Sequence, residues 1–122
     1  MADPVSESFP RQLRLTRAID FQQVFKNNIR RGDAHITILV GKKTGDCPRL
    51  GFAIARKQVP KAVQRNTLKR MFRESFRKNR HRLPPRDMVV MVKRGILVIE
   101  PARIRAALEQ HWDSIIEQCE NS

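Results

Sequence analysis

Residues 87–93 read Asp-Met-Val-Val-Met-Val-Lys, an almost continuous apolar run between two charged residues. Such a run is typical of a strand that is buried on both faces, as the central strands of parallel sheets are. Pro84-Pro85, just before the run, ends any helix that precedes it. The run therefore predicts a central strand with a parallel neighbour, around which the other elements are arranged.

The segment before this strand, residues 61–80, is the clearest helix in the sequence. Pro60 stands at its start, and its apolar residues recur at helical spacing: Leu68, Met71, Phe72 and Phe76. At roughly 100° per residue, six cations fall on the other side of the helix: Arg65, Lys69, Arg70, Arg73, Arg77 and Arg80. We expect this helix to bury one side in a core and to present a broad cationic face on the other.

Further towards the N-terminus, two segments predict strands. Residues 34–41 are rich in β-branched side chains, and residues 49–55 form a second short apolar stretch. The intervening segment 42–48 contains Gly45 and Pro48 and is typical of a turn or loop. We therefore expect an antiparallel hairpin.

Two more helices complete the pattern. A short amphipathic helix is expected over residues 17–27, with Thr16 as its N-cap, and a final helix over residues 101–118. Residues 1–15 contain two prolines and no apolar periodicity, and we expect them to be extended. The order of helix, two or three strands, helix, strand and helix predicts one α+β domain over residues 1–122 with a small sheet.

The composition indicates a polyanionic partner. Lys and Arg number 25 against 12 acidic residues, a formal net charge of +13, while a hydrophobic fraction of 40% supports a folded core. Residues 1–99 hold 23 basic and 7 acidic side chains, whereas residues 100–122 hold 2 and 5. The partner is therefore expected to meet the first four-fifths of the chain.

The charge is densest around the basic helix. Between Arg56 and Arg86 there are 12 basic residues and one acidic residue, Glu74. Solvated helices normally mix their signs, and like charges this dense repel one another unless a polyanion relieves them. Arg predominates over Lys, which suits bidentate phosphate contacts and stacking on bases. The segment therefore predicts binding to a folded RNA.

Other features bear on the compartment. Cys47 and Cys119 lie far apart without metal-ligand spacing, which suits free thiols in a reducing compartment. No apolar run approaches the ~20 residues of a membrane span, and the first residues lack the features of a signal peptide. We expect a cytoplasmic protein with no membrane contact.

The run Lys61-Ala-Val-Gln-Arg-Asn-Thr-Leu-Lys-Arg-Met-Phe-Arg-Glu-Ser-Phe-Arg77 closely resembles the RNR signature helix of the bacterial ribonuclease P protein family. Resemblance extends in the same order to three other parts of the chain: Arg49–Lys57, Phe9–Leu15 and Asp20–Phe25. The third signature position, usually Arg, is Thr67 here, so the contact of that side chain is not carried over. The resemblance covers nearly the whole chain.

The resemblance implies a fold more specific than the periodicity does. It implies a single-domain αβββαβα sandwich, ribosomal protein S5 domain 2-like, with a four-stranded sheet and a left-handed βαβ crossover around the signature helix. Patterning alone would not suggest that hand, because right-handed crossovers dominate.

For function, the resemblance implies the accessory protein subunit of ribonuclease P, a ribonucleoprotein endoribonuclease whose RNA is the catalyst. The protein would bind that RNA and the 5′ leader of precursor tRNA, and would assist Mg²⁺-dependent removal of the leader. Mg²⁺ would be held mainly by the RNA, and neither an organic cofactor nor an obligate protein partner is expected.

The resemblance also assigns residues to two surfaces. Those expected to face the catalytic RNA are Arg56, Lys57, Lys61, Arg65, Asn66, Lys69, Arg70, Arg73 and Arg77. Those expected to bind the leader are Arg11, Arg14, Phe21, Phe25 and an exposed sheet face that includes Ile36 and Ile38. Aromatic rings can stack on unpaired bases without demanding a sequence. On spacing alone, Phe21 and Phe25 are more often ordinary core residues.

The sequence carries no catalytic constellation that we recognise. There is no Walker loop, no HExxH and no Cys/His cluster, and the three histidines are scattered. Isolated carboxylates among cations are a poor setting for metal ions, so we expect no catalytic or metal-binding residue in the protein. The main alternative is a ribosomal or other general RNA-binding protein; a DNA-binding regulator and a self-sufficient nuclease are weaker candidates.

Overall fold

The computed structural model describes residues 13–43 and 45–120. Its elements, in chain order, are α2 (Ala18–Lys26), β1 (Ile29–Gly32), β2 (Ile36–Lys43), β3 (Arg49–Ala53), α3 (Ala62–Asn79), β4 (Arg86–Val92), the 3₁₀ turn η2 (Ile96–Val98) and α4 (Pro101–Glu120). The three predicted helices and the three predicted strands are all present, with ends shifted by up to two residues. Among the described residues, none of the helices has both the length and the apolarity needed to cross a membrane.

The four strands form one mixed sheet in the order β1-β2-β4-β3. β1 and β2 are antiparallel, as are β2 and β4, whereas β3 and β4 are parallel. The prediction of a central strand with a parallel neighbour is confirmed by β4, in which Met88, Val89 and Val90 are fully buried.

The expected antiparallel hairpin of residues 34–41 with 49–55 is wrong, because β4 lies between β2 and β3. β3 lies two strand positions away from β2, and the most apolar strand, β4, fills the position between them. In that position β4 pairs on both edges and is covered on both faces, which removes the most apolar surface from water.

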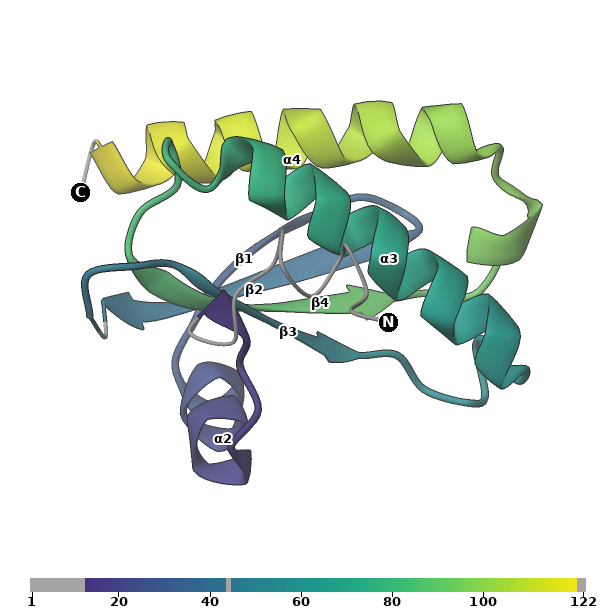
Figure 1. Ribbon diagram of the computed structural model, residues 1–122, viewed down its shortest axis with the longest axis horizontal. Coiled ribbons are helices and arrows are strands. Elements are labelled where there is room, and N and C mark those ends of the chain that lie inside the picture. Colours follow the sequence, from purple (N-terminus) through teal and green to yellow (C-terminus); the bar gives the residue numbers. More distant parts are fainter. Residues whose placement is uncertain (1–12, 44, 121–122) are drawn as a thin grey trace, which may run out of the picture.

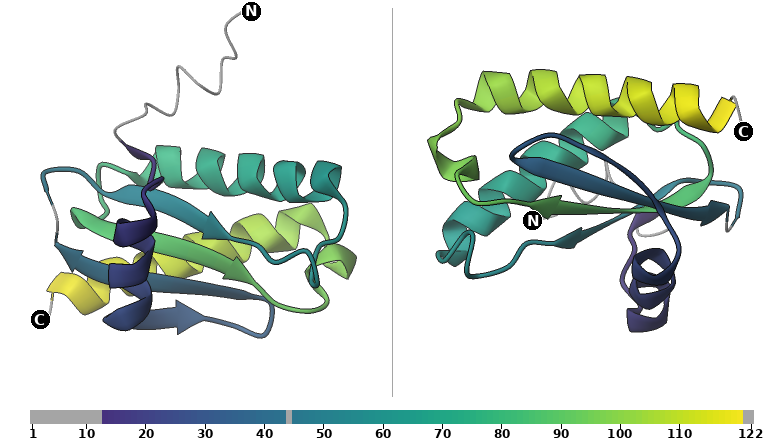
Figure 2. Two further views of the ribbon diagram at one scale, coloured as in Figure 1. Left: turned by 90° about the horizontal axis from the view of Figure 1, so that it is seen from below. Right: turned by 180° about the vertical axis from the view of Figure 1, so that it is seen from behind.

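Helices cover both faces of the sheet. α3 and α4 lie together on one face, and α2 crosses the other (Figures 1 and 2). With β3 and β4 pointing away from the viewer and α3 above the sheet, β4 lies to the left of β3, as Figures 1 and 2 show. The crossover is therefore left-handed, as the resemblance implied, although about 98% of such connections are right-handed.

The main core lies between the sheet and the α3–α4 layer. Alternate strand residues enter it, among them Ile36, Ile38, Met88 and Val90, and α4 contributes Trp112. The other face of the sheet holds a smaller cluster under α2: Leu15, Val24, Leu39 and Val89. Because side chains alternate along a strand, odd-numbered residues of β2 and β4 face α2 and even-numbered ones face α3 and α4.

The start of α2 differs from the prediction. Its N-cap is Arg17 instead of Thr16, and no side chain caps the helix. Of the segment expected to be extended, only Leu13–Leu15 lies within the described residues, and there Arg14 pairs with Leu50 of β3 in an isolated parallel bridge. Leu13 and Leu15 are buried, so this stretch is tied to the sheet edge.

Candidate RNA-binding surfaces

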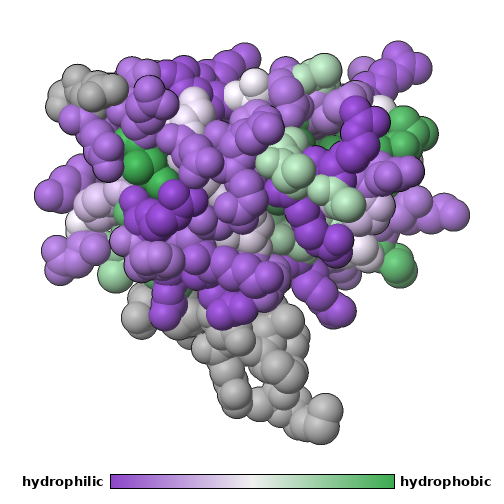
Figure 3. Space-filling view, turned by 90° about the horizontal axis from the view of Figure 1, so that it is seen from above, coloured by the Kyte–Doolittle hydropathy of each residue, from purple (hydrophilic) through white to green (hydrophobic). Residues whose placement is uncertain are grey.

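We call the nine residues expected to face RNA the α3 surface; they are Arg56, Lys57, Lys61, Arg65, Asn66, Lys69, Arg70, Arg73 and Arg77. The structure brings them together, because Leu68, Phe72 and Phe76 bury the opposite side of α3 in the main core. Arg56 and Lys57 lie in the connection that leads from β3 into the helix. Figure 3 looks onto the face formed by α3 and α4 and shows a mostly hydrophilic surface.

Two arginines of the α3 surface are held by contacts with neighbouring elements. Arg65 Nη1 donates to the carbonyl oxygens of Val59 at 2.9 Å and Pro60 at 2.8 Å, so its guanidinium lies against the loop before α3. The Arg73 guanidinium lies 5.3 Å from the centroid of the Phe52 ring on β3. These contacts restrict both side chains, which lowers the entropic cost of binding an anion.

Arg77 of this surface is partly neutralised by a carboxylate. Its Nη2 donates to Glu74 Oε1 at 2.5 Å. This hydrogen bond holds the pKa of Glu74 below its ordinary value and raises the pKa of Arg77. Among the residues the structure describes, Lys69 and Arg70 make no ion pair, so they are the more available cations of the helix.

The α2 surface lies on the other side of the sheet and comprises two aromatic residues of α2, Phe21 and Phe25, with Gln23, Lys26, Asn27 and Lys42. Phe21 and Phe25, one turn apart, lie on one flank of the helix. The Phe21 ring packs against Gly51 of β3 and is partly buried, whereas Phe25 is 45% exposed. Of the two rings, Phe25 is therefore the one available to stack on a ligand.

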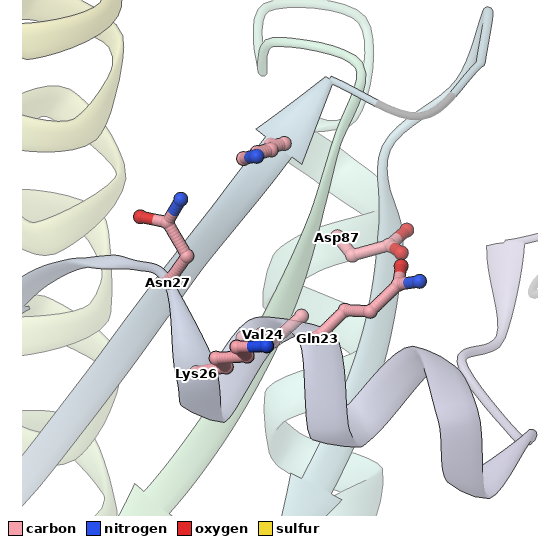
Figure 4. A pocket seen from close by; sticks show the side chains of 6 residues that line it. Gln23, Val24, Lys26, Asn27 and Asp87 are labelled. Carbon is pink, nitrogen blue, oxygen red and sulfur yellow. The ribbon is translucent and has the colours of Figure 1, made fainter.

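The other flank of α2 borders a hollow of about 470 Å³. The residues that line it are Gln23, Val24, Lys26, Asn27, Lys42 and Asp87 (Figure 4). In Figure 4, Gln23 and Asp87 point toward one another across it. Apart from Val24 the lining residues carry polar or charged groups, among them the cations Lys26 and Lys42, which can meet a phosphate. The leader prediction did not include these residues, because polar residues without a periodic pattern give no signal in the sequence.

A charged network underlies the hollow. Arg49 on β3 makes two hydrogen bonds of 2.7 Å with Asp87, and its Nη1 lies 3.6 Å from Asp20 Oδ2. Asp20 also lies 3.6 Å from Arg17 Nε. The hydrogen bonds that Arg49 donates to Asp87 raise the pKa of Arg49. Both carboxylates thus already have a guanidinium partner.

One part of the predicted leader site is wrong. Ile36 and Ile38 are 1% and 0% exposed and lie in the main core beneath α3 and α4, not on an exposed sheet face. The side of β2 that faces α2 instead carries Thr37 and Leu39, both also buried. An error of one residue in assigning the inward-facing positions exchanges the two faces of a strand. In β2 the residues on both faces are largely apolar, so the sequence does not show which of them lie beneath α3 and α4. Of the other predicted contacts, Arg14 is half-buried, and Arg11 lies outside the described residues.

The carboxylates of these surfaces do not fit a magnesium site. Within residues 13–43 and 45–120, no three His, Cys, Asp or Glu side chains group together as metal ligands. Asp20 and Asp87, the buried pair on the α2 side, flank the Arg49 guanidinium, whose charge opposes a divalent cation. The described carboxylates of the two surfaces therefore do not fit a bound magnesium ion.

A cationic helix on one face of a small α+β sheet and an exposed aromatic ring on the other are features of an RNA-binding protein. The family model described as Ribonuclease P matches residues 9–116. The chain therefore belongs to the ribonuclease P protein family. Proteins of this family are the accessory subunits of a ribonucleoprotein endonuclease, in which they work with the ribonuclease P RNA in tRNA processing.

Two curated relatives are called ribonuclease P protein component. The one from Thioalkalivibrio sulfidiphilus is 43% identical over 117 residues, 96% of this chain and 98% of the relative. The one from Cronobacter sakazakii is 44% identical over 108 residues, 88% and 91% of the two chains.

Solved structures give the same result for the fold. The ribonuclease P protein of Staphylococcus aureus has a TM-score of 0.75 at 25% identity, with 81% of this chain and 91% of that chain covered. The ribonuclease P protein of Thermotoga maritima has a TM-score of 0.73 at 31% identity, with 84% and 96% covered.

Proposed function

We propose that this protein binds the ribonuclease P RNA through the α3 surface and the 5′ leader of precursor tRNA through the α2 surface. The observation that carries the proposal is that the two surfaces lie on opposite faces of one four-stranded sheet. A rigid, positively charged slab between two RNAs reduces the repulsion between their phosphates. The protein thereby assists Mg²⁺-dependent removal of the leader, while the RNA carries out the chemistry.

The α3 surface supports the first part of this proposal. It holds eight cations, among which Arg77 is paired with Glu74 and Arg65 is already oriented by two backbone carbonyls. Each phosphate that these cations neutralise releases condensed counterions, so the affinity falls steeply with salt. Asn66, exposed amid the cations, adds an amide that can donate to a phosphate or a base.

The α2 surface supports the second part. Phe25 presents an exposed ring, and the opposite flank of the helix borders a polar hollow with Lys26 and Lys42 on its rim. A ring that stacks on bases and cations that meet phosphates bind single-stranded RNA without reading its sequence. A leader of varied sequence calls for this kind of contact.

Mg²⁺ in this proposal is held by the RNA, because the protein's carboxylates near the two surfaces are engaged by arginines. The protein lowers the Mg²⁺ concentration that the reaction requires by supplying positive charge of its own. We also place the protein in the cytoplasm, where its two free thiols, Cys47 and Cys119, would stay reduced.

The test measures cleavage of a precursor tRNA by the cognate ribonuclease P RNA at low and at high Mg²⁺. Lys61→Ala/Lys69→Ala removes two cations of the α3 surface, and Arg30→Ala/Arg103→Ala removes two exposed cations elsewhere. Phe25→Ala removes the exposed ring of α2, and Ile19→Ala, also exposed on that helix, is its control.

The wild-type protein should be inert without the RNA and should restore cleavage at low Mg²⁺. The Lys61/Lys69 variant should bind the RNA about tenfold more weakly. The Phe25 variant should keep that affinity but bind leader-bearing substrate about five- to tenfold more weakly, with no change for a substrate that lacks a leader. Equal effects of the test and control variants would overturn the two-surface proposal.

A further inference from the structure

A second groove lies between α3 and α4. It is separate from the part of the α3 surface that lies beside β3. It measures about 650 Å³. From α3 it is lined by Thr67, Arg70, Met71 and Lys78, and from α4 by Arg105 and Ala106. Figure 3 looks onto this side of the molecule and shows pale green hydrophobic areas enclosed by hydrophilic side chains.

The groove combines an apolar floor with cations on both walls. Met71 and Ala106 provide the apolar surface, whereas Arg70 and Arg105 stand on the facing helices, and both are exposed. Thr67, the position at which the sequence departs from the RNR signature, is short and turns its hydroxyl back to the Val63 carbonyl oxygen at 2.9 Å. A short side chain at this position leaves the groove open.

Two acidic residues also line the groove: Glu74 is paired with cations, whereas Glu109 accepts a hydrogen bond from a neutral amide and keeps its charge. Glu74 pairs with Arg77 at 2.5 Å and with Lys78 at 3.9 Å. Glu109 Oε1 accepts a hydrogen bond of 3.0 Å from Asn79 Nδ2. Neither Arg70 nor Arg105 makes an ion pair within the described part of the chain. The groove therefore keeps a cation on each wall that is available to an external anion.

We propose that the α3–α4 groove is a nucleotide-binding subsite for the ribonuclease P RNA, in which Arg105 and Arg70 hold one backbone phosphate from opposite helices. The adjoining ribose or base lies on Met71 and Ala106. The inference rests on the proposed function of the α3 surface and deepens it, since Arg70 belongs to both. It also assigns an RNA contact to the segment 100–122, whose net negative charge had placed it outside the expected interface.

RNA suits this groove because the groove offers cations beside an apolar surface, and a nucleotide carries a phosphate beside a ribose and a base. A phosphate needs converging guanidinium groups, and an unstacked base or ribose needs an apolar surface next to them. The groove is also continuous with the cationic face of α3 through Arg70. An RNA strand that lies along α3 reaches Arg105 without leaving the protein.

The test is binding of the full chain to a transcript of the cognate ribonuclease P RNA over a range of salt concentrations. Arg105→Ala is compared with Arg103→Ala, which removes the same charge from an exposed position of the same helix outside the groove. Arg105→Ala should weaken binding about five- to tenfold and lower the salt slope by about one, while Arg103→Ala should change the affinity less than about twofold. Hydroxyl-radical footprinting should show protection lost at one or two nucleotides with Arg105→Ala only.

Arg105→Lys keeps a cation on the α4 wall of the groove and should retain most of the affinity that Arg105→Ala loses. Equal losses for Arg103→Ala and Arg105→Ala, or an unchanged footprint, would overturn the subsite. In that case Lys61→Ala/Lys69→Ala still reports on the proposed function. If that variant also binds normally, the α3 surface itself is not the RNA-binding surface.

Discussion

Arg49 and Asp87 are register partners near the starts of the parallel strands β3 and β4, and two hydrogen bonds of 2.7 Å join their side chains. Asp87 is 2% exposed, so its carboxylate depends on this partner for its solvation. The pair ties the edge strand β3 to the centre of the sheet, beside the hollow of the α2 surface.

Asp87→Asn should therefore destabilise the fold by about 2 kcal/mol, since it removes the charge that accepts both short hydrogen bonds from Arg49 and leaves this half-buried guanidinium with the more distant Asp20, at 3.6 Å. Urea unfolding, followed by circular dichroism, measures this. Asp46→Asn, at an exposed position in the loop before β3, should change the stability by less than about 0.5 kcal/mol. Equal effects of the two substitutions would show that the buried pair contributes nothing specific.

Gly51→Ala should disturb the α2 surface without touching the α3 surface. A Cβ atom at this position would lie 2.6 Å from Phe21 Cζ and 3.0 Å from Leu15 Cβ, so the Phe21 ring must move. We expect weaker binding of leader-bearing precursor tRNA and unchanged affinity for the ribonuclease P RNA, both measured by titration. Gly45→Ala adds the same methyl group where nothing lies within 4 Å and should be silent. Unaltered leader binding in the Gly51 variant would mean that the Phe21 ring does not position the leader site.

Asp33, in the turn between β1 and β2, should contribute to acid unfolding. Burial raises the pKa of this carboxyl, but hydrogen bonds from the His35 and Ile36 amides and from His111 outweigh burial and hold it below its ordinary value. A carboxyl with a depressed folded-state pKa contributes stability that is present above its unfolded-state pKa and is lost as the pH falls through the folded one.

The melting temperature should therefore decline below about pH 4, and less steeply in Asp33→Asn than in the wild type. The gap between the two proteins should close at the lowest pH. A gap that stays constant from pH 7 to pH 2.5 would show that the Asp33 charge is not linked to folding.

Ser75→Ala should loosen the contact of α4 with α3. Trp112, fully buried and the single tryptophan of the chain, donates from Nε1 to Ser75 Oγ at 2.8 Å and packs edge-on against Phe76. Loss of the acceptor leaves a buried N–H unpaired and should cost about 1 to 2 kcal/mol. Tryptophan fluorescence and circular dichroism during the same urea titration give both the stability and the environment of Trp112. Unchanged stability would imply that the indole finds another acceptor.

Elements with a strong local pattern could be predicted from the sequence. The helix of residues 61–80 and the strand of residues 87–93 each carry their own periodicity, and the structure places them at Ala62–Asn79 and Arg86–Val92. The cationic face of α3 followed from the same pattern, because a helix that buries Leu68 and Phe72 must present the residues opposite them to solvent.

Strand pairing could not be predicted in this way. Residues 34–41 and 49–55 looked like a hairpin because they are neighbours in sequence, yet β4 separates them. The faces of β2 were also hidden, since Ile36-Thr-Ile-Leu-Val40 is buried at every position and has no alternation to show which side meets α3. Both features depend on contacts between residues far apart in the chain.

The sequence by itself determined the α+β class, the positions of three helices and a central strand, and the dense positive charge that requires a polyanion. These properties are local or compositional, so they need no knowledge of what packs against what. Only the tertiary structure decided the strand order, the burial of Ile36 and Ile38, and the placement of Arg70 and Arg105 on the two helices that line the α3–α4 groove. Such relationships arise when segments far apart in the sequence pack into one core. The free energy gained by burying their apolar surface together then outweighs the local conformational preference of any single segment.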